Sequence, residues 1–312
     1  MNLLILAASL PILFCPKGPE TLPALKKAGA TAIAVPPDLV SSWKANGKGI
    51  QVEALDPRTL IKLSKPSVNF RMGYASATRE PWVDSNGWRI LREPNGRFFY
   101  EAPGKASALA AAEAFSYGAT GVVQTDQAGL EPFERMLAVL QAAGRSNLPP
   151  EFNFEYFDDG SKNSAEFMNL LVRSNLLFKV VARRDATGQS LQVALGTPDF
   201  PQSEAANPKL LAEKVRAKIT DPKRLLRVYG SSVVIGRLMG DGARARLFLL
   251  NYGAGRGSVN GVRIRLLGEY RRHKEWQFDC PNAQLTDYVA QSGATEFTVA
   301  DLPMFAVIDL SH

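Results

Sequence analysis

Residues 97–126, RFFYEAPGKASALAAAEAFSYGATGVVQTD, contain a short apolar run, an alanine-rich segment and a second short apolar run. The runs at 97–101 and 120–126 have the length of buried strands, and the segment from Ser107 to Tyr117 has the composition of a helix. Two strands joined in this way are typical of a parallel sheet covered by helices.

The same alternation starts at Pro11 and gives about six strand–helix units by Gly144. Gly29 and Pro66 stand where helices are expected to end. We therefore predict an α/β protein whose N-terminal domain, residues 11–145, is a (β/α) barrel-like arrangement. The expected strands are 12–15, 31–36, 50–55, 68–72, 97–101 and 120–126, and the expected helices are 22–28, 39–44, 57–63, 107–117 and 130–143.

The pattern changes after SNLPP at 146–150, which reads as a linker. One more strand–helix–strand unit between 151 and 182 either completes the barrel or begins a small flavodoxin-like domain, and a helix is expected at 208–218. Short alternating strands separated by Gly, Asp and Asn then predict an all-β sandwich. The expected domains are a signal segment at 1–10, the barrel-like domain at 11–145, an α/β segment at 151–220 and the sandwich at 221–312.

Composition limits the chemistry. The 312 residues include two cysteines, Cys15 and Cys280, and two histidines, His273 and His312. This inventory argues against a Cys/His metal cluster, a Cys-His dyad and a Ser-His-Asp triad. Any hydrolytic chemistry must then rest on carboxylates, and we expect neither a metal nor a cofactor.

The net charge of +7 is spread along the chain without a Lys/Arg run. We therefore expect no nucleic-acid partner, and an anionic polysaccharide is as good a partner for this charge as a nucleic acid. Residues 1–10, MNLLILAASL, resemble the apolar core of a secretory signal, although no basic residue precedes that core. We expect an exported protein without an integral membrane span, and its oligomeric state stays open.

The run from Arg71 to Glu101 concentrates tryptophans, arginines and carboxylates. Such a segment is costly to bury unpaired, and it more often lines a ligand site. The alternative is a structural loop anchored by its aromatic residues. The residues expected to position an oligo- or polysaccharide are Arg71, Trp82, Asp84, Asn86, Trp88 and Arg89.

Two carboxylates follow predicted strands directly, Glu101 after FFY and Asp126 after TGVVQT. Because the carboxyl ends of barrel strands meet at one mouth, we expect this pair to face a common substrate. A glycosidase needs such a pair, one as acid and one as nucleophile or base. Glu53 and Asp84 are further candidates, and for each carboxylate a structural salt bridge is the alternative.

The order of parts, with EAPGKASALAAAEAFSYGATGVVQTD, NLLVRSNLLFKVV and TEFTVADLPMFAVIDL, resembles bacterial glycoside-hydrolase-like proteins of the three-domain β-galactosidase type. The resemblance implies a barrel, a flavodoxin-like middle domain, a terminal sandwich and glycoside hydrolysis. The barrel portion is shorter than the roughly 250 residues of that fold, and the paired glutamate motifs are not matched. A noncatalytic carbohydrate-binding or cell-envelope protein with a degenerate barrel therefore stays open, as does an interaction module with a basic sandwich.

Overall fold

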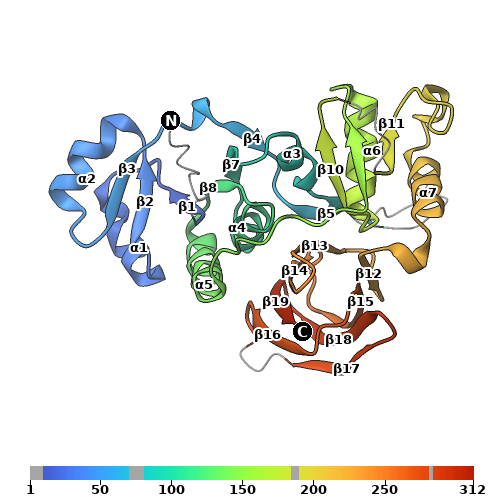
Figure 1. Cartoon of the computed structure of the whole chain (residues 1–312). Coiled ribbons are helices and arrows are strands. Elements are labelled where there is room, and N and C mark those ends of the chain that lie inside the picture. The colour runs from blue at the N-terminus through green and yellow to red at the C-terminus, as the bar shows by residue number, and fades with distance from the viewer. Residues whose placement is uncertain (1–9, 70–80, 184–189, 281–283) are drawn as a thin grey trace, which may run out of the picture. The chain divides into compact units, whose positions relative to one another are not determined.

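The computed structural model describes residues 10–69, 81–183, 190–280 and 284–312 (Figure 1). The chain divides into two compact units. Unit 1 comprises the residues up to Ser67 together with Glu93–Arg145, and unit 2 comprises Val68–Arg92 together with Ser146–His312. Among the described residues, no helix has the length and apolar character needed to cross a membrane.

Unit 1 is built on a six-stranded sheet with the strand order β3-β2-β1-β8-β7-β4, in which all neighbours are parallel. The last strand of the unit therefore returns to pair with the first, as it does in a barrel. In the described part of the chain no pairing joins the two edge strands, so the sheet is open there. The strands are β1 (Ile12–Phe14), β2 (Ala32–Val35), β3 (Gln51–Ala54), β4 (Ile61–Leu63), β7 (Arg97–Glu101) and β8 (Thr120–Gln124).

The helices of unit 1 form largely where their composition and end signals predict them. They are α1 (Leu22–Ala28), α2 (Val40–Asn46), α4 (Ala106–Ser116) and α5 (Gln127–Ala143). Gly29 ends α1 with a φ of 94°, a conformation that glycine adopts without strain. Small side chains let α4 pack closely on β8, because a Cβ added to Gly121 would lie 2.7 Å from the Cβ of Ala114.

The prediction of a helix at 57–63 is wrong. A 3-10 turn, η3 (Pro57–Thr59), is followed by β4, which pairs in parallel with β7. A segment this short gains little from helical hydrogen bonds, whereas pairing with a neighbouring strand satisfies its backbone groups.

Unit 2 begins with a two-stranded sheet, β5 (Ser67–Asn69) and β6 (Trp82–Asp84), followed by the helix α3 (Gly87–Arg92). Ser67, the first residue of β5, still belongs to unit 1. A separate three-stranded parallel sheet follows, with the order β10-β9-β11. The segment after the linker thus forms a sheet of its own. Its strands are β9 (Phe154–Phe157), β10 (Phe178–Val181) and β11 (Gln192–Ala194), with the helices α6 (Lys162–Arg173) and α7 (Pro208–Ile219).

The C-terminal part of unit 2 is a sandwich of two four-stranded antiparallel sheets, β12-β15-β18-β17 and β13-β14-β19-β16. Their facing side chains form one buried cluster that includes Leu247, Ile264, Phe297 and Ile308. The predicted parallel α/β region followed by antiparallel sheets is therefore confirmed. The strands are β12 (Leu226–Tyr229), β13 (Val234–Gly240), β14 (Arg244–Asn251), β15 (Val259–Leu267), β16 (Arg272–Gln277), β17 (Leu285–Gln291), β18 (Ala294–Leu302) and β19 (Phe305–Ser311).

Candidate functional site

One row of paired residues crosses five strands of the unit 1 sheet at their carboxyl ends. The pairing registers join neighbouring strands at this level one by one. Residues paired in this way point to the same side of a parallel sheet. From β3 to β7 the row consists of Glu53, Ala34, Phe14, Gln124 and Glu101.

The side of the sheet on which the row lies also carries an apolar cluster. Phe14 and Ala34, which belong to the row, pack with Leu55, Phe99 and Val122. Residues two apart on a strand share a face, so Glu101 lies on the same face as Phe99, and Gln124 on the same face as Val122. We call this side the carboxylate face. It combines an apolar floor with two carboxylates and an amide at the strand ends.

Two ion pairs lie on the carboxylate face. Lys62 Nζ on β4 lies 2.8 Å from Glu101 Oε1, and Arg97 Nη2 on β7 lies 3.2 Å from Glu53 Oε1 on β3. A flat sheet would place β3 and β7, four strand spacings apart, at about 19 Å from each other. The second ion pair therefore requires the sheet to curve toward the carboxylate face, which is concave.

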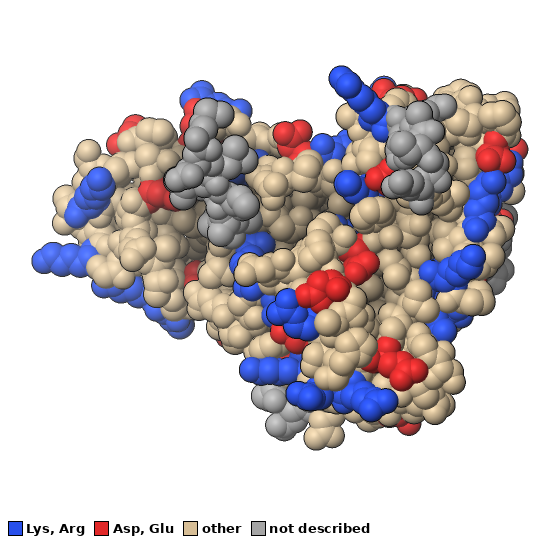
Figure 2. All heavy atoms as spheres, in the orientation of Figure 1, with Lys and Arg blue, Asp and Glu red and all other residues tan. Residues whose placement is uncertain are grey.

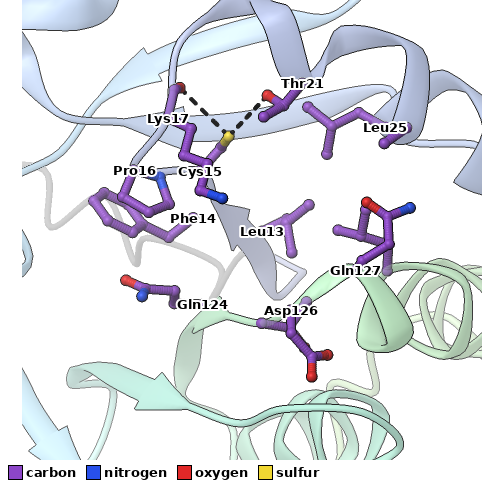
Figure 3. Close-up of a pocket in the computed structure, with 13 residues that line it drawn as sticks. Leu13, Phe14, Cys15, Pro16, Lys17, Thr21, Leu25, Gln124, Asp126 and Gln127 are labelled. Carbon is purple, nitrogen blue, oxygen red and sulfur yellow. Dashed lines mark hydrogen bonds between the residues drawn. The ribbon is translucent and has the colours of Figure 1, made fainter.

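Asp126 has a different environment. It is the N-cap of α5, and its Oδ1 accepts hydrogen bonds from the backbone N–H of Gly129 at 3.0 Å and of Gly104 at 2.9 Å. In Figure 3 its carboxylate points away from Cys15. This carboxylate joins the loop after β7 to the start of α5, and it lies two residues beyond the row that contains Glu101.

A cavity of about 210 Å³ lies between the segments that follow β1 and β8 (Figure 3). Cys15 lines it, with the thiol 3.4 Å from Thr21 Oγ1 and 3.6 Å from the carbonyl oxygen of Lys17. Gln124, which belongs to the carboxylate row, lines it as well. Its volume is below the roughly 300 to 1,000 Å³ of ordinary ligand pockets, so it suits at most part of a sugar.

The aromatic residues of the predicted sugar-binding run lie in unit 2. The Arg173 guanidinium stacks on Trp82 at 4.1 Å from the ring centroid and donates a hydrogen bond to the Pro81 carbonyl. Trp88 has Arg89 at 4.3 Å and Arg92 at 5.1 Å from its ring. Each indole ring therefore has an arginine neighbour within the protein.

Asn86 is fully buried, and its Oδ1 accepts a hydrogen bond from Arg89. Arg92 pairs with Asp158 at 2.7 Å, which ties α3 to the end of β9. Asp84 is half-buried on β6, and Arg71 lies outside the described residues. The predicted sugar-positioning residues that the structure describes thus belong to unit 2, whereas Glu101 and Asp126 belong to unit 1.

Three polar residues of the carboxylate face, Lys62, Arg97 and Gln124, were not predicted as site residues. The alternation Arg97-Phe99-Glu101 along one strand would have shown that Arg97 shares a face with Glu101. A helix at 57–63, as the sequence pattern predicts, would not place Lys62 on the sheet, whereas the strand β4 does. Within the described part of the chain, no group of three or more His, Cys, Asp and Glu residues is arranged to hold a metal ion.

Comparison with solved structures shows the fold. α-L-fucosidase isoenzyme 2 from Paenibacillus thiaminolyticus superposes with a TM-score of 0.56 at 10% identity, over 88% of this chain and 70% of the fucosidase. The catalytic module of a family 98 glycoside hydrolase from Streptococcus pneumoniae (TM-score 0.28, 9% identity, 93% of this chain and 76% of that one) is too distant to support an argument. The same is true of a maltogenic α-amylase from Thermotoga neapolitana (TM-score 0.25, 10% identity, 97% and 99%).

No protein-family model matches this sequence, and no curated protein is detectably similar to it in sequence. The structural similarity to a glycoside hydrolase is therefore a similarity of fold.

Proposed function

We propose that this protein acts on carbohydrate and hydrolyses glycosidic bonds at the carboxylate face of unit 1, with Glu101 as one of two reacting carboxylates. The observation that carries the proposal is the register row, which places Glu53 and Glu101 on one concave face with Gln124 between them. A fold shared with a glycoside hydrolase supports it but does not identify the reaction.

Glycoside hydrolysis needs one carboxylic acid to protonate the leaving oxygen and one carboxylate to attack the sugar or to activate water. Glu53 is our first choice as the partner of Glu101, because the curvature of the sheet brings the two sides of the row toward each other. Asp126, the partner expected from the sequence, is the second choice, since backbone amides already occupy its Oδ1. The residues expected from the sequence to position the sugar are not part of the proposed unit 1 site: Trp82, Asp84, Asn86, Trp88 and Arg89 belong to unit 2, and Arg71 lies outside the described residues.

The test is the release of reducing sugar from a broad glycan panel, measured for the purified protein and for three variants, Glu101→Gln, Glu53→Gln and Asp126→Asn. Glu131→Gln is the matched control, because Glu131 is an exposed carboxylate of unit 1 in an ion pair with Arg135. Loss of activity in Glu101→Gln together with one other variant supports the proposal and identifies the pair. Activity that survives all three substitutions contradicts it.

A noncatalytic carbohydrate-binding protein is the second candidate. Both Glu53 and Glu101 are about half exposed and paired with a cation, as carboxylates often are on protein surfaces without any catalytic role. Glycan binding that persists in Glu101→Gln, with no sugar released from any member of the panel, would favour this candidate. We propose export from the cell for either candidate, on the basis of residues 1–10.

A further inference from the structure

A second cavity, of about 370 Å³, lies entirely within unit 2. It is formed by the end of α6, one face of α7 and the turn between β12 and β13. Its volume falls within the roughly 300 to 1,000 Å³ of small-molecule sites, unlike the cavity beside Cys15. The charged and hydroxyl-bearing residues that line it are Arg173, Ser174, Lys209, Glu213, Arg216, Ser231 and Ser232.

The lining is cationic. Lys209, Glu213 and Arg216 follow one another at helical spacing on α7, and Arg173 closes the last turn of α6. The lining thus holds three cations and one carboxylate. Figure 2 shows Lys and Arg side chains gathered over the part of unit 2 where α7 lies.

The two arginines of the lining are held in place by other residues of unit 2. Arg173 stacks on Trp82 and donates to the Pro81 carbonyl, and Arg216 forms a two-point ion pair with Asp221 at 2.9 and 2.7 Å. Fixed guanidinium groups lose little entropy when they bind an anion.

The end of α6 would ordinarily present carbonyl oxygens that repel an anion. Here the buried Arg224 donates hydrogen bonds to the carbonyls of Ser174 and Asn175. Burial lowers the pKa of Arg224, and the charge of nearby Arg216 lowers it further, while Asp221 raises it.

We propose that this cavity binds an acidic sugar unit, with Arg173, Lys209 and Arg216 facing its anionic group and the hydroxyls of Ser231 and Ser232 facing its ring. The inference rests on the proposed carbohydrate function and specifies the substrate class as an anionic glycan. It is tested by binding alone, so it is separate from catalysis on unit 1.

The experiment is calorimetric titration of the full chain at low ionic strength with tetragalacturonate, with its methyl ester as the uncharged counterpart and with inorganic sulfate as a competitor. We expect the acid to bind and the ester to bind at least about tenfold more weakly, since charge-assisted hydrogen bonds are the strong ones. Added salt should weaken binding of the acid.

Lys209→Met and Arg216→Met should each weaken tetragalacturonate binding about five- to tenfold, and Glu213→Gln should strengthen it, because it removes the one carboxylate of the lining. Lys218→Met on the same helix is the matched control, since Lys218 pairs with Asp199 and does not line the cavity. Thermal melting shows whether Arg216→Met still folds, and Glu213→Gln tests the site independently of that variant.

Equal binding of the ester, or unchanged binding in both Lys209→Met and Glu213→Gln, would overturn the inference. If sulfate displaces tetragalacturonate at a concentration equal to that of tetragalacturonate, the cavity recognises only the charge, and its assignment as a sugar site would be overturned. If binding follows these expectations while no glycan is hydrolysed, the acidic-sugar site stands and the catalytic part of the proposed function fails.

Discussion

Arg97 and Glu53 form an ion pair across the concave side of the unit 1 sheet, although three strands separate β7 from β3. The contact requires a curved sheet, and it places a cation beside one of the two carboxylates of the row. At the other edge of the sheet, Lys62 on the neighbouring strand β4 forms an ion pair with Glu101.

We expect Arg97→Met to change stability little, by less than about 1 kcal/mol, because both partners are about half exposed and such pairs contribute little. Reducing-sugar release should nevertheless fall at least about fivefold if Arg97 positions Glu53 for the reaction. Urea unfolding and the glycan panel measure the two effects. Arg135→Met, which breaks an exposed ion pair on α5, serves as the control and should leave both quantities unchanged.

Asp126 should behave as a structural cap in unfolding experiments. Asp126→Ala removes the acceptor of two backbone N–H groups and should cost about 1 to 2 kcal/mol of unfolding free energy. Asp126→Asn keeps an acceptor oxygen and should cost clearly less. A loss of sugar release in a stably folded Asp126→Asn variant would instead make Asp126 the partner of Glu101.

Sequence patterns located most elements of this fold because helices and buried strands carry strong periodic signals. The alanine-rich helix α4 and the strands β7 and β8 lie within a residue or two of their predicted bounds. The strands β16 and β17 were not predicted. Both are edge strands of their sheets. An edge strand tolerates charged residues that an inner strand would not, and β16, with the sequence RHKEWQ, therefore lacks the apolar pattern of a buried strand.

The candidate site was harder to predict. Glu101 was found because it ends a strand, but the row that joins it to Glu53 depends on strand order, which periodicity does not contain. Because a helix is predicted where β4 forms, the sequence does not indicate that Lys62 lies on the same sheet as Glu101. The arginine contact of Trp82 also comes from a residue that only the tertiary fold brings near, Arg173 on α6.

Gly121 should tolerate no side chain. A Cβ at this position would lie 2.7 Å from the Cβ of Ala114, and both α4 and β8 are buried. We expect Gly121→Ala to lower the unfolding free energy by about 1 to 3 kcal/mol through overpacking. Gly121→Ala combined with Ala114→Gly should recover part of that loss, and two independent effects that simply add would contradict the packing argument.

Glu134 should make stability depend on pH. Burial raises the pKa of its carboxyl from 4.5 to about 7, and its Oε1 has no hydrogen-bond partner among the described residues. Between about pH 4.5 and 7 the unfolded chain is ionised at this residue while the folded chain keeps the proton, so the contribution of Glu134 to stability falls as pH rises through this window.

Glu134→Gln removes this penalty. The variant should match the parent below about pH 4.5 and be more stable by about 1 to 2 kcal/mol above pH 7, a figure reduced for the partial exposure of the side chain. Urea unfolding at pH 4.5, 6 and 8 measures the difference. Glu131→Gln, which changes an exposed carboxylate on the same helix, should show no such pH-dependent gain. A constant difference between Glu134→Gln and the parent at all three pH values would mean that the carboxyl of Glu134 titrates alike in the folded and unfolded chains.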